Sequence, residues 1–289
     1  MLFFHAFMRE MRVPQWTKNI LVFAALLFSG EIFAWHAAFL SVELFFAFSF
    51  VASGVYFFND LVDYETDRAH PKKRHRPIAS GALSKRAGVC GACVLFALGL
   101  ALAWQIRPLC FAIVLSYVLI NLAYTVWLKH VVILDVMIIA YGFVARAVVG
   151  AVAIGAGMTT WFLLCVLFLS LFLALGKRRH ELLALEENQL DEGRRVLDCY
   201  SLALIDQLMT IVTSALLMSY ALFTMDSATR NAEMMELTIP LVIYGMFYYL
   251  YVVRIKGEGG APDEALYQEK PILIVVVLYI AVLVFIRNL

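Results

Sequence analysis

The chain has 289 residues, of which 63% are hydrophobic and 16% are charged, and its mean hydropathy is +0.84. Its formal net charge at pH 7 is only +1. This composition excludes a soluble domain of ordinary make-up, and it favours a membrane protein that has no nucleic-acid partner.

Segments of about 20 apolar residues, the length that crosses a bilayer as a helix, recur along nearly the whole chain. They predict nine transmembrane helices, at about 19–35, 38–58, 87–106, 108–127, 131–155, 159–177, 202–224, 237–255 and 271–288. We therefore expect an all-α polytopic membrane protein that forms one domain over residues 1–289. The sequence does not predict its oligomeric state.

Nearly all basic residues fall on one side of the predicted helices. Of the 23 Lys and Arg residues, the exceptions are Arg107, Arg146, Arg230 and Arg287. By the positive-inside rule, this bias orients the N-terminus and the long connections, roughly 59–86 and 178–201, toward the cytoplasm of a bacterial-type inner membrane. An odd number of spans then puts the C-terminus outside.

The entrance of the first predicted span carries the motif Arg12-Val-Pro-Gln15-Trp16-Thr-Lys18-Asn19. It combines two cations, two amides and an indole. Such residues are typical of an interfacial belt, because positive charges and amphipathic rings favour the headgroup region. A role in a substrate site is the alternative.

The second predicted span continues into the segment Asn59-Asp60-Leu-Val-Asp63-Tyr-Glu65-Thr-Asp67, here called the acidic segment. On a helix, the amide and all carboxylates except Glu65 fall within an arc of about 100°. Carboxylates that share a face repel one another unless a cation lies among them, and hard oxygen ligands suit Mg²⁺ bound to substrate phosphates. The segment therefore predicts a magnesium and diphosphate site at the cytoplasmic surface, with a solvated helix end as the alternative.

A dense basic stretch follows from Arg68 to Gly81. Its two prolines and its glycine predict an ordered loop over the cytoplasmic mouth. Basic side chains of this loop, such as Lys73 and Arg76, can bind the phosphate groups of a substrate. For any single cation, anchoring to anionic lipid headgroups is the alternative.

Tyr124, Lys129 and Asp135 lie around the connection between the fourth and fifth predicted spans. Arg146 follows Asp135 at a spacing that brings it to about 20° from Asp135 on an ideal helix, so the two face the same interior. A charge at membrane depth costs roughly 2.5–3.5 kcal/mol on insertion scales, so Arg146 needs a partner or a wet cavity. We favour a functional role here, with a structural ion pair as the alternative.

The sixth predicted span ends with Lys177-Arg178-Arg-His-Glu181. Lys177 and Glu181 are helical neighbours that can form a salt bridge at the helix end. We favour a substrate-facing role for Lys177, Arg178 and Glu181.

The acidic segment at the end of span two, about nine spans, and long connections after spans two and six together resemble the UbiA superfamily of intramembrane prenyltransferases. Four motifs bring this resemblance, which covers nearly the full chain, closer to the decaprenyl-phosphate phosphoribosyltransferase branch. They are Arg12-x-x-Gln15-Trp16-x-Lys18-Asn19, Asp67-Arg68-x-His70-Pro71-x-Lys73-x-x-Arg76-Pro77-Ile78-Ala79-Ser80-Gly81, Leu128-Lys129-His130-x-x-x-Leu134-Asp135 and Gly176-Lys177-Arg178-x-x-Glu181-Leu182.

The resemblance implies transfer of 5-phosphoribose from phosphoribosyl diphosphate to a polyprenyl phosphate, with Mg²⁺ as cofactor, for a lipid-linked pentose precursor of cell-envelope polysaccharide. We expect Asp60, Asp63 and Asp67, helped by Asn59, to hold Mg²⁺ on the leaving diphosphate. The cations assigned to substrate phosphates are Lys18, Lys73, Arg76, Lys129, Lys177 and Arg178. The residues expected to support the site are Arg12, Gln15, Asn19, Arg68, Tyr124, Asp135, Arg146 and Glu181.

Two other functions remain open. An aromatic polyprenyltransferase of the same superfamily would use the same carboxylates on a prenyl diphosphate. The second aspartate-rich motif of such enzymes is absent after span six, however, where Lys177-Arg178-x-x-Glu181 stands. A membrane carrier would bind a solute at Asp135 and Arg146, since membrane charges often mark transport paths, but it leaves the one-sided clustering of the carboxylates unexplained.

Overall fold

The computed structural model describes residues 2–31, 33–186, 195–226, 232–256 and 269–288, and every regular element in these ranges is helical. Seven helices in these ranges are long and apolar enough to cross a membrane, and a further apolar stretch, Lys270–Ile286, is shorter. The predicted all-α polytopic membrane architecture is thus confirmed, while the count of nine spans stays a prediction.

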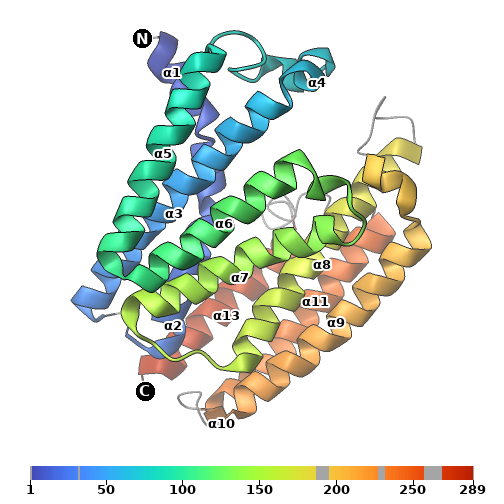
Figure 1. The fold of residues 1–289 in the computed structure, drawn as a ribbon. Helices are drawn as coiled ribbons and strands as arrows, with labels where there is room; N and C mark the ends of the chain where they lie inside the picture. The colour runs from blue at the N-terminus through green and yellow to red at the C-terminus, as the bar shows by residue number, and fades with distance from the viewer. Residues whose placement is uncertain (1, 32, 187–194, 227–231, 257–268, 289) are drawn as a thin grey trace. The chain divides into compact units, whose positions relative to one another are not determined.

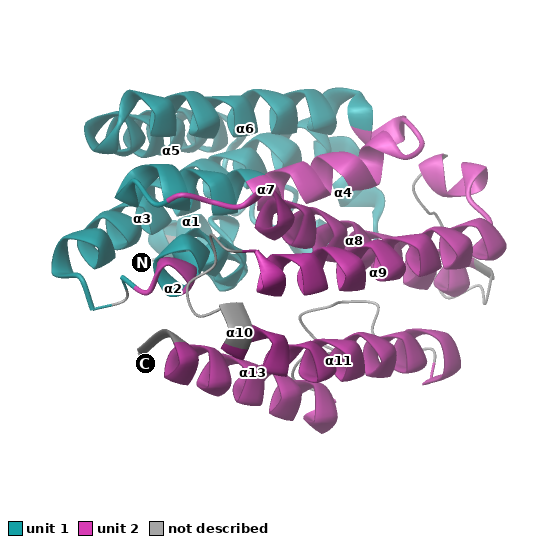
Figure 2. Cartoon of the chain, turned by 90° about the horizontal axis from the view of Figure 1, so that it is seen from below, with its two compact units in different colours: residues 1–27, 31–128, 145–156 teal, residues 28–30, 129–144, 157–289 magenta. Residues whose placement is uncertain are grey.

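The chain folds as two compact units, coloured separately in Figure 2. The first comprises residues 1–27, 31–128 and 145–156, and the second comprises residues 28–30, 129–144 and 157–289. Each unit has a hydrophobic core of its own. The division into two units leaves the expectation of one domain over residues 1–289 a prediction.

The N-terminal segment of the first unit changes helix type at Arg12. α1 (Leu2–Glu10) precedes this residue, whose backbone lies in the left-handed region with φ 51° and ψ 48°. The 3₁₀ helix η1 (Val13–Phe23) follows, with Pro14 in its first turn. Proline suits that position because its missing N–H has no helical partner there. Arg12 therefore turns the chain between two helices.

A short helix, α2 (Ala24–Ser29), follows η1 and precedes Gly30, which has φ 77°. Glycine adopts this left-handed conformation after a helix at little cost, because it has no Cβ atom. The first predicted span, at about 19–35, therefore falls on η1 and α2 rather than on one long α-helix.

In the first unit, α3 (Trp35–Val62) and α5 (Lys85–Ile106) run side by side (Figure 1). A Cβ atom added to Gly99 of α5 would lie 2.5 Å from the carbonyl oxygen of Ala47 in α3. Small residues permit such close approach between membrane helices. The core beside this contact includes Phe48, which is fully buried.

The acidic segment and the basic stretch at 68–81 lie at the C-terminal end of α3 and include α4 (Tyr64–Ala69) and η2 (Lys73–His75). The first unit also contains α6 (Pro108–Val126) and the C-terminal part of α7 (Leu134–Ile154), with η3 (Leu128–His130) between α6 and α7 in the sequence.

In the second unit, α8 (Thr160–Glu186) packs along α9 (Leu202–Met225). Its other elements are η4 (Arg195–Cys199), α10 (Ala232–Met235), η5 (Glu236–Thr238), α11 (Ile239–Tyr251), the π-helix η6 (Val252–Lys256) and α13 (Lys270–Asn288). Its core includes Phe172, Ile205 and Tyr249. The N-terminal part of α7 also belongs to this unit.

Candidate functional site

The acidic segment stays helical across a break at the end of α3. α3 ends at Val62, and Asp63, with φ −85° and ψ 11°, connects it to α4. The backbone N–H of Asp63 donates to the carbonyl of Asn59 at 2.9 Å, and that of Asp67 donates to the carbonyl of Asp63 at 2.8 Å. These helical hydrogen bonds bridge the break and keep the acidic side chains in helical register.

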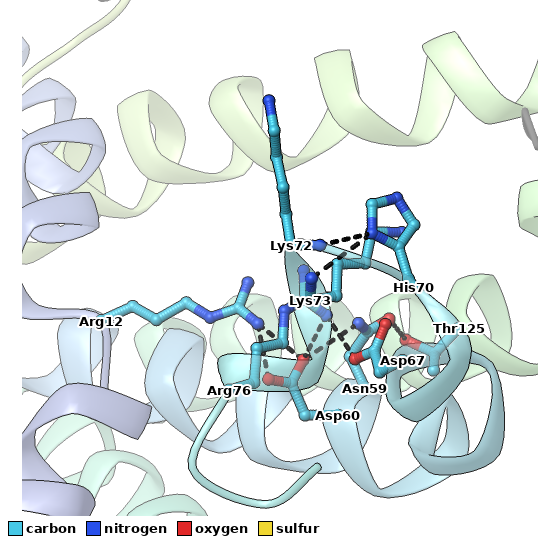
Figure 3. Close-up of polar contacts among 9 residues, drawn as sticks. All are labelled: Arg12, Asn59, Asp60, Asp67, His70, Lys72, Lys73, Arg76 and Thr125. Atoms are coloured by element: carbon cyan, nitrogen blue, oxygen red, sulfur yellow. Dashed lines mark hydrogen bonds and ion pairs between the residues drawn. The ribbon is translucent and has the colours of Figure 1, made fainter. Parts of the chain in front are cut away.

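Asp60 and Asp67, both buried, share one arginine. Nη1 of Arg76 lies 3.1 Å from Oδ1 of Asp60 and 2.6 Å from Oδ2 of Asp67. Nη2 of Arg12 donates to both oxygens of Asp60, at 2.6 and 2.7 Å. Figure 3 shows the two guanidinium groups converging on Asp60 from different segments of the chain. Such charge-assisted hydrogen bonds fix the geometry of both carboxylates.

The backbone and the ring of a neighbour together aim the guanidinium group of Arg12. Non-glycine residues rarely adopt the left-handed conformation found at Arg12, and such outliers gather at functional sites. The guanidinium carbon also lies 4.9 Å from the centroid of the Tyr56 ring. Arg12, predicted only as a supporting residue, thus forms an ion pair with the Asp60 carboxylate directly.

The amide of Asn59 lies beside the same carboxylate, with Nδ2 3.5 Å from Oδ1 of Asp60. On its other side, Oγ1 of Thr125 in α6 lies 3.5 Å from Oδ1 of Asn59. Both contacts are long for hydrogen bonds, so they are weak and leave the Asn59 amide able to bind another partner.

The remaining acids of the segment differ in exposure. The Glu65 side chain is 82% exposed, and its carboxylate lies 3.7 Å from Nζ of Lys85. Asp63 is half-buried. Burial raises the pKa of Asp67 above its ordinary value, and the positive charge of Arg76 opposes this shift. A further cation near Asp67 would stabilise the ionised carboxylate.

A cavity of about 250 Å³ lies beside Asp60 and is here called the basic cavity. It is lined by Arg9, Glu10, Arg12, Asp60, Lys72, Lys73, His75, Arg76 and Pro77. Five of these side chains are Lys or Arg, one is His and two are acidic. Nδ1 of His70 accepts the backbone N–H groups of Lys72 and Lys73, at 3.2 and 3.4 Å, and so stabilises the loop that carries them. The excess of positive charge suits a ligand with several phosphate groups.

Glu10 is a cavity residue that sequence reasoning missed. It is 1% exposed, and neither carboxylate oxygen has a hydrogen-bond partner among the residues that the structure describes. Burial and, to a smaller extent, the neighbouring Asp60 carboxylate raise the pKa of Glu10 to about 8, against the positive charge of Arg12. The only available signal was an acid at the end of an apolar segment, directly before the Arg12 motif.

Arg146 of α7 has two polar partners in the first unit, Asn19 and Tyr117. Its Nε donates to Oδ1 of Asn19 at 2.7 Å, and its Nη2 lies 3.2 Å from the hydroxyl of Tyr117. Nδ2 of Asn19 in turn donates to Oγ of Ser49 at 2.9 Å. The guanidinium carbon also lies 4.7 Å from the centroid of the Phe48 ring. A partner or a wet cavity was predicted for this membrane-depth charge, and the structure places an amide, a tyrosine hydroxyl and the Phe48 ring against it.

Several predicted site residues lie outside the group that contacts Asp60. Lys18 and Arg68 are exposed, and Gln15, Tyr124 and Lys129 are half-buried. None of these side chains lines the basic cavity.

A second polar cluster lies in the second unit, around Asp135. This carboxylate accepts a hydrogen bond from Nε of Arg178 at 2.7 Å and one from the hydroxyl of Tyr200 at 2.8 Å. The Tyr200 hydroxyl also accepts the backbone N–H of Ile133 at 2.8 Å. Burial and the hydrogen bond to Asp135 raise the pKa of Tyr200 to about 12. Sequence reasoning missed Tyr200 because it lies far from Asp135 in the chain.

The guanidinium group of Arg178 is buried among carboxylates. Its Nη1 donates to Glu181, and the side chain is 1% exposed. Two of the three guanidinium nitrogens thus already face carboxylates of the protein. Lys177 is exposed, so it is the more accessible of the two cations predicted here for phosphate.

The donor chemistry of the acidic segment fits a magnesium ion. Among the described residues, no three Asp, Glu, His or Cys side chains gather closely enough to form a ready-made metal cage. Mg²⁺ usually retains several waters and binds through one or two carboxylates plus substrate phosphates, so such a cage is not required. Asp60, Asp67 and the amide of Asn59 supply hard oxygen ligands at the edge of a cavity that suits phosphates.

Comparisons with known proteins agree with this geometry. The model of the UbiA prenyltransferase family matches residues 19–267. The chain is 35% identical to decaprenyl-phosphate phosphoribosyltransferase from Corynebacterium glutamicum, over 91% of this chain and 80% of that protein. It is 32% identical to the protein of the same name from Mycolicibacterium smegmatis, over 94% and 89%.

Among solved structures, a UbiA homologue from Archaeoglobus fulgidus bound to GPP and Mg²⁺ has a similar fold, with a TM-score of 0.74. The similarity covers 98% of this chain and 100% of that one, at 19% identity.

Proposed function

The chain belongs to the UbiA prenyltransferase family, and we propose that it transfers 5-phosphoribose from phosphoribosyl diphosphate to a decaprenyl-type polyprenyl phosphate, releasing diphosphate. The observation that carries this proposal is the basic cavity, where five Lys and Arg side chains accompany only two carboxyl groups. The relatives named for this reaction support the same assignment.

The number of cations favours this reaction over transfer of a prenyl group to an aromatic acceptor. Phosphoribosyl diphosphate carries a diphosphate and a 5-phosphate, and the lipid acceptor brings a further phosphate. A prenyl diphosphate with an aromatic acceptor brings one diphosphate. Lys73 and Arg76 of the basic cavity are the best placed of the predicted phosphate-binding cations, whereas Lys18, Lys129, Lys177 and Arg178 stay predictions.

The aspartates of the acidic segment, Asp60, Asp63 and Asp67, would hold Mg²⁺ with the amide of Asn59. When bound, the ion neutralises the negative charge that develops on the leaving diphosphate. Arg76 contacts both Asp60 and Asp67. Its release from one of them would expose carboxylate oxygens and free a guanidinium N–H for a phosphate.

The bond changes need no general base from the protein. An oxygen of the lipid phosphate forms a bond to C1 of the ribose as the bond from C1 to the diphosphate oxygen breaks, and its electron pair leaves with the diphosphate. Because the lipid phosphate is already an anion, no proton has to be removed from it. The protein's task is to hold the phosphate groups, which Arg12, Lys73 and Arg76 are placed to do.

The protein is a multi-pass membrane protein, and we propose that its N-terminus and the basic cavity face the cytoplasm, with the C-terminus outside. The asymmetry of Lys and Arg along the chain supports this orientation.

The direct test supplies membranes containing this protein with Mg²⁺, polyprenyl phosphate and ribose-labelled phosphoribosyl diphosphate. Label should appear in the lipid extract, and it should disappear when the ion is chelated and return when Mg²⁺ is restored. If no lipid becomes labelled, while labelled prenyl diphosphate reacts with an aromatic acid, the protein is an aromatic prenyltransferase instead.

A further inference from the structure

One carboxylate in the basic cavity is unsatisfied. Glu10 is buried, and neither of its oxygens has a hydrogen-bond partner of good geometry among the described residues. Nearly all buried polar atoms in proteins are hydrogen-bonded, because an unpaired one loses its interactions with water without replacement. Glu10 lines the cavity, so a ligand there can supply the missing partner.

Glu10 is also held in place. It is the last residue of α1, and the next residue, Met11, is buried and donates its backbone N–H to the carbonyl of Phe7 at 3.0 Å. The ring of Phe7 packs on that of Phe57 in α3, with 5.1 Å between centroids. The end of α1 is therefore anchored to the helix that carries Asp60, so Glu10 cannot easily turn away to water.

A diphosphate alone is a poor partner for Glu10. Phosphate oxygens without a proton can only accept hydrogen bonds, so they would leave the acceptor positions of Glu10 unpaired. A neutral group with hydrogen-bond donors does not have this difficulty.

We propose that Glu10 accepts hydrogen bonds from the 2′- and 3′-hydroxyl groups of the donor ribose, and so selects a sugar diphosphate over a prenyl diphosphate. The inference rests on the proposed function, because it assumes phosphoribosyl diphosphate in the basic cavity. Two hydroxyls on adjacent carbons match the two oxygens of one carboxylate, and acidic side chains bind ribose hydroxyls in the same way in dinucleotide-binding folds. A prenyl diphosphate has no hydroxyl to offer.

The test removes a hydroxyl from the donor, the carboxylate from Glu10, or both at once. Purified full-length protein in lipid nanodiscs is given phosphoribosyl diphosphate or its 2′-deoxy or 3′-deoxy analogue. The measured quantities are kcat/KM for transfer and, without acceptor, the Kd of each donor. The variants are Glu10→Gln, which keeps the side-chain shape, and Glu65→Gln as the matched control at an exposed acid.

Wild-type protein should bind each deoxy analogue about 10- to 100-fold more weakly than the full donor, the range for a lost hydrogen bond that leaves a buried polar group unpaired. E10Q should bind the full donor about tenfold more weakly, yet lose about threefold or less on further removal of a hydroxyl. E65Q should behave as wild type. Comparison between variants cancels any change in intrinsic reactivity that the missing hydroxyl causes.

Three results would overturn the inference. Wild-type protein that transfers ribose but binds the deoxy analogues as tightly as the full donor would refute it without any variant, even if E10Q failed to fold. The second result is an E10Q protein that still distinguishes the full donor from the deoxy analogues as wild type does, but binds Mn²⁺ more weakly in the absence of donor. Glu10 would then be a metal ligand. No ribose transfer by wild-type protein would instead refute the proposed function, and this inference with it.

Discussion

Asp135 and Arg178 form an ion pair in the interior of the second unit, with 2.7 Å between Oδ2 and Nε and side-chain exposures of 0% and 1%. Tyr200 donates to the other oxygen of Asp135. The carboxylate and the guanidinium thus have their charges paired within the protein. This arrangement favours a structural role for Arg178 over the phosphate-binding role predicted from the sequence.

Replacement of Arg178 by Met should therefore destabilise the protein. Removing one partner of a buried pair leaves the other charge uncompensated, at a cost of about 3–5 kcal/mol. The measurement is thermal unfolding of purified protein in detergent, with Lys177→Met as the exposed neighbour, whose stability should change little. Asp135→Asn combined with Arg178→Met should lose less than the two single variants together. A fully stable Arg178→Met protein that binds donor weakly would restore the phosphate-binding role.

Replacing a buried acid of the acidic segment should lower the transfer rate, whereas replacing its exposed acid should not. Asp60→Asn and Asp67→Asn keep the side-chain shape but remove a charge that Arg76 contacts, and each should lower ribose transfer by about 10²-fold or more. Glu65→Gln should be tolerated, because its carboxylate is exposed and pairs with Lys85. Transfer rates are compared at equal amounts of folded protein. Equal losses at Glu65 and Asp67 would contradict the assignment.

Arg76 should tolerate no conservative replacement. One nitrogen of its guanidinium group contacts both Asp60 and Asp67, and the side chain lines the basic cavity. A lysine ammonium could replace that one nitrogen between the carboxylates, but it would leave no second nitrogen to bind a substrate phosphate, so Arg76→Lys should raise the KM for phosphoribosyl diphosphate about tenfold. Arg74→Lys, at an exposed position of the same loop outside the cavity lining, is the matched control. An unchanged KM in Arg76→Lys would show that only charge is needed here.

The sequence predicted those features of the site and fold that depend on partners close in the chain or on a strong helical or apolar periodicity. Helical spacing brought Asn59, Asp60 and Asp67 to one face, and the apolar stretches located the long helices. Long-range partners left no local signal. Arg146 meets Asn19 from 127 residues away, and nothing in either segment specifies the other.

Glu10 was missed for a related physical reason. An acid next to arginines at the end of an apolar segment has the pattern of a solvated helix end. Only the packing of α1 against α3, through Phe7 and Phe57, buries it beside Asp60. Likewise, the first predicted span had the right composition for a long helix, but Arg12 and Pro14 begin a 3₁₀ helix there instead.

The close approach of α3 and α5 can be tested by adding a single methyl group. A Cβ at Gly99 would lie 2.5 Å from the Ala47 carbonyl oxygen, a backbone atom that cannot rotate away, so Gly99→Ala should force the helices apart and cost about 1–3 kcal/mol. At Gly245, the nearest atom to an added Cβ is Cγ1 of Val275 at 3.4 Å, an ordinary contact. Gly245→Ala should therefore be neutral, or more stable by up to about 1 kcal/mol, because alanine favours helix. Thermal unfolding in the same detergent compares the two. Since the helix preference is the same at both sites, any excess loss at Gly99 measures the helix contact, and equal stability of the two variants would mean that α3 and α5 have room for a methyl group there.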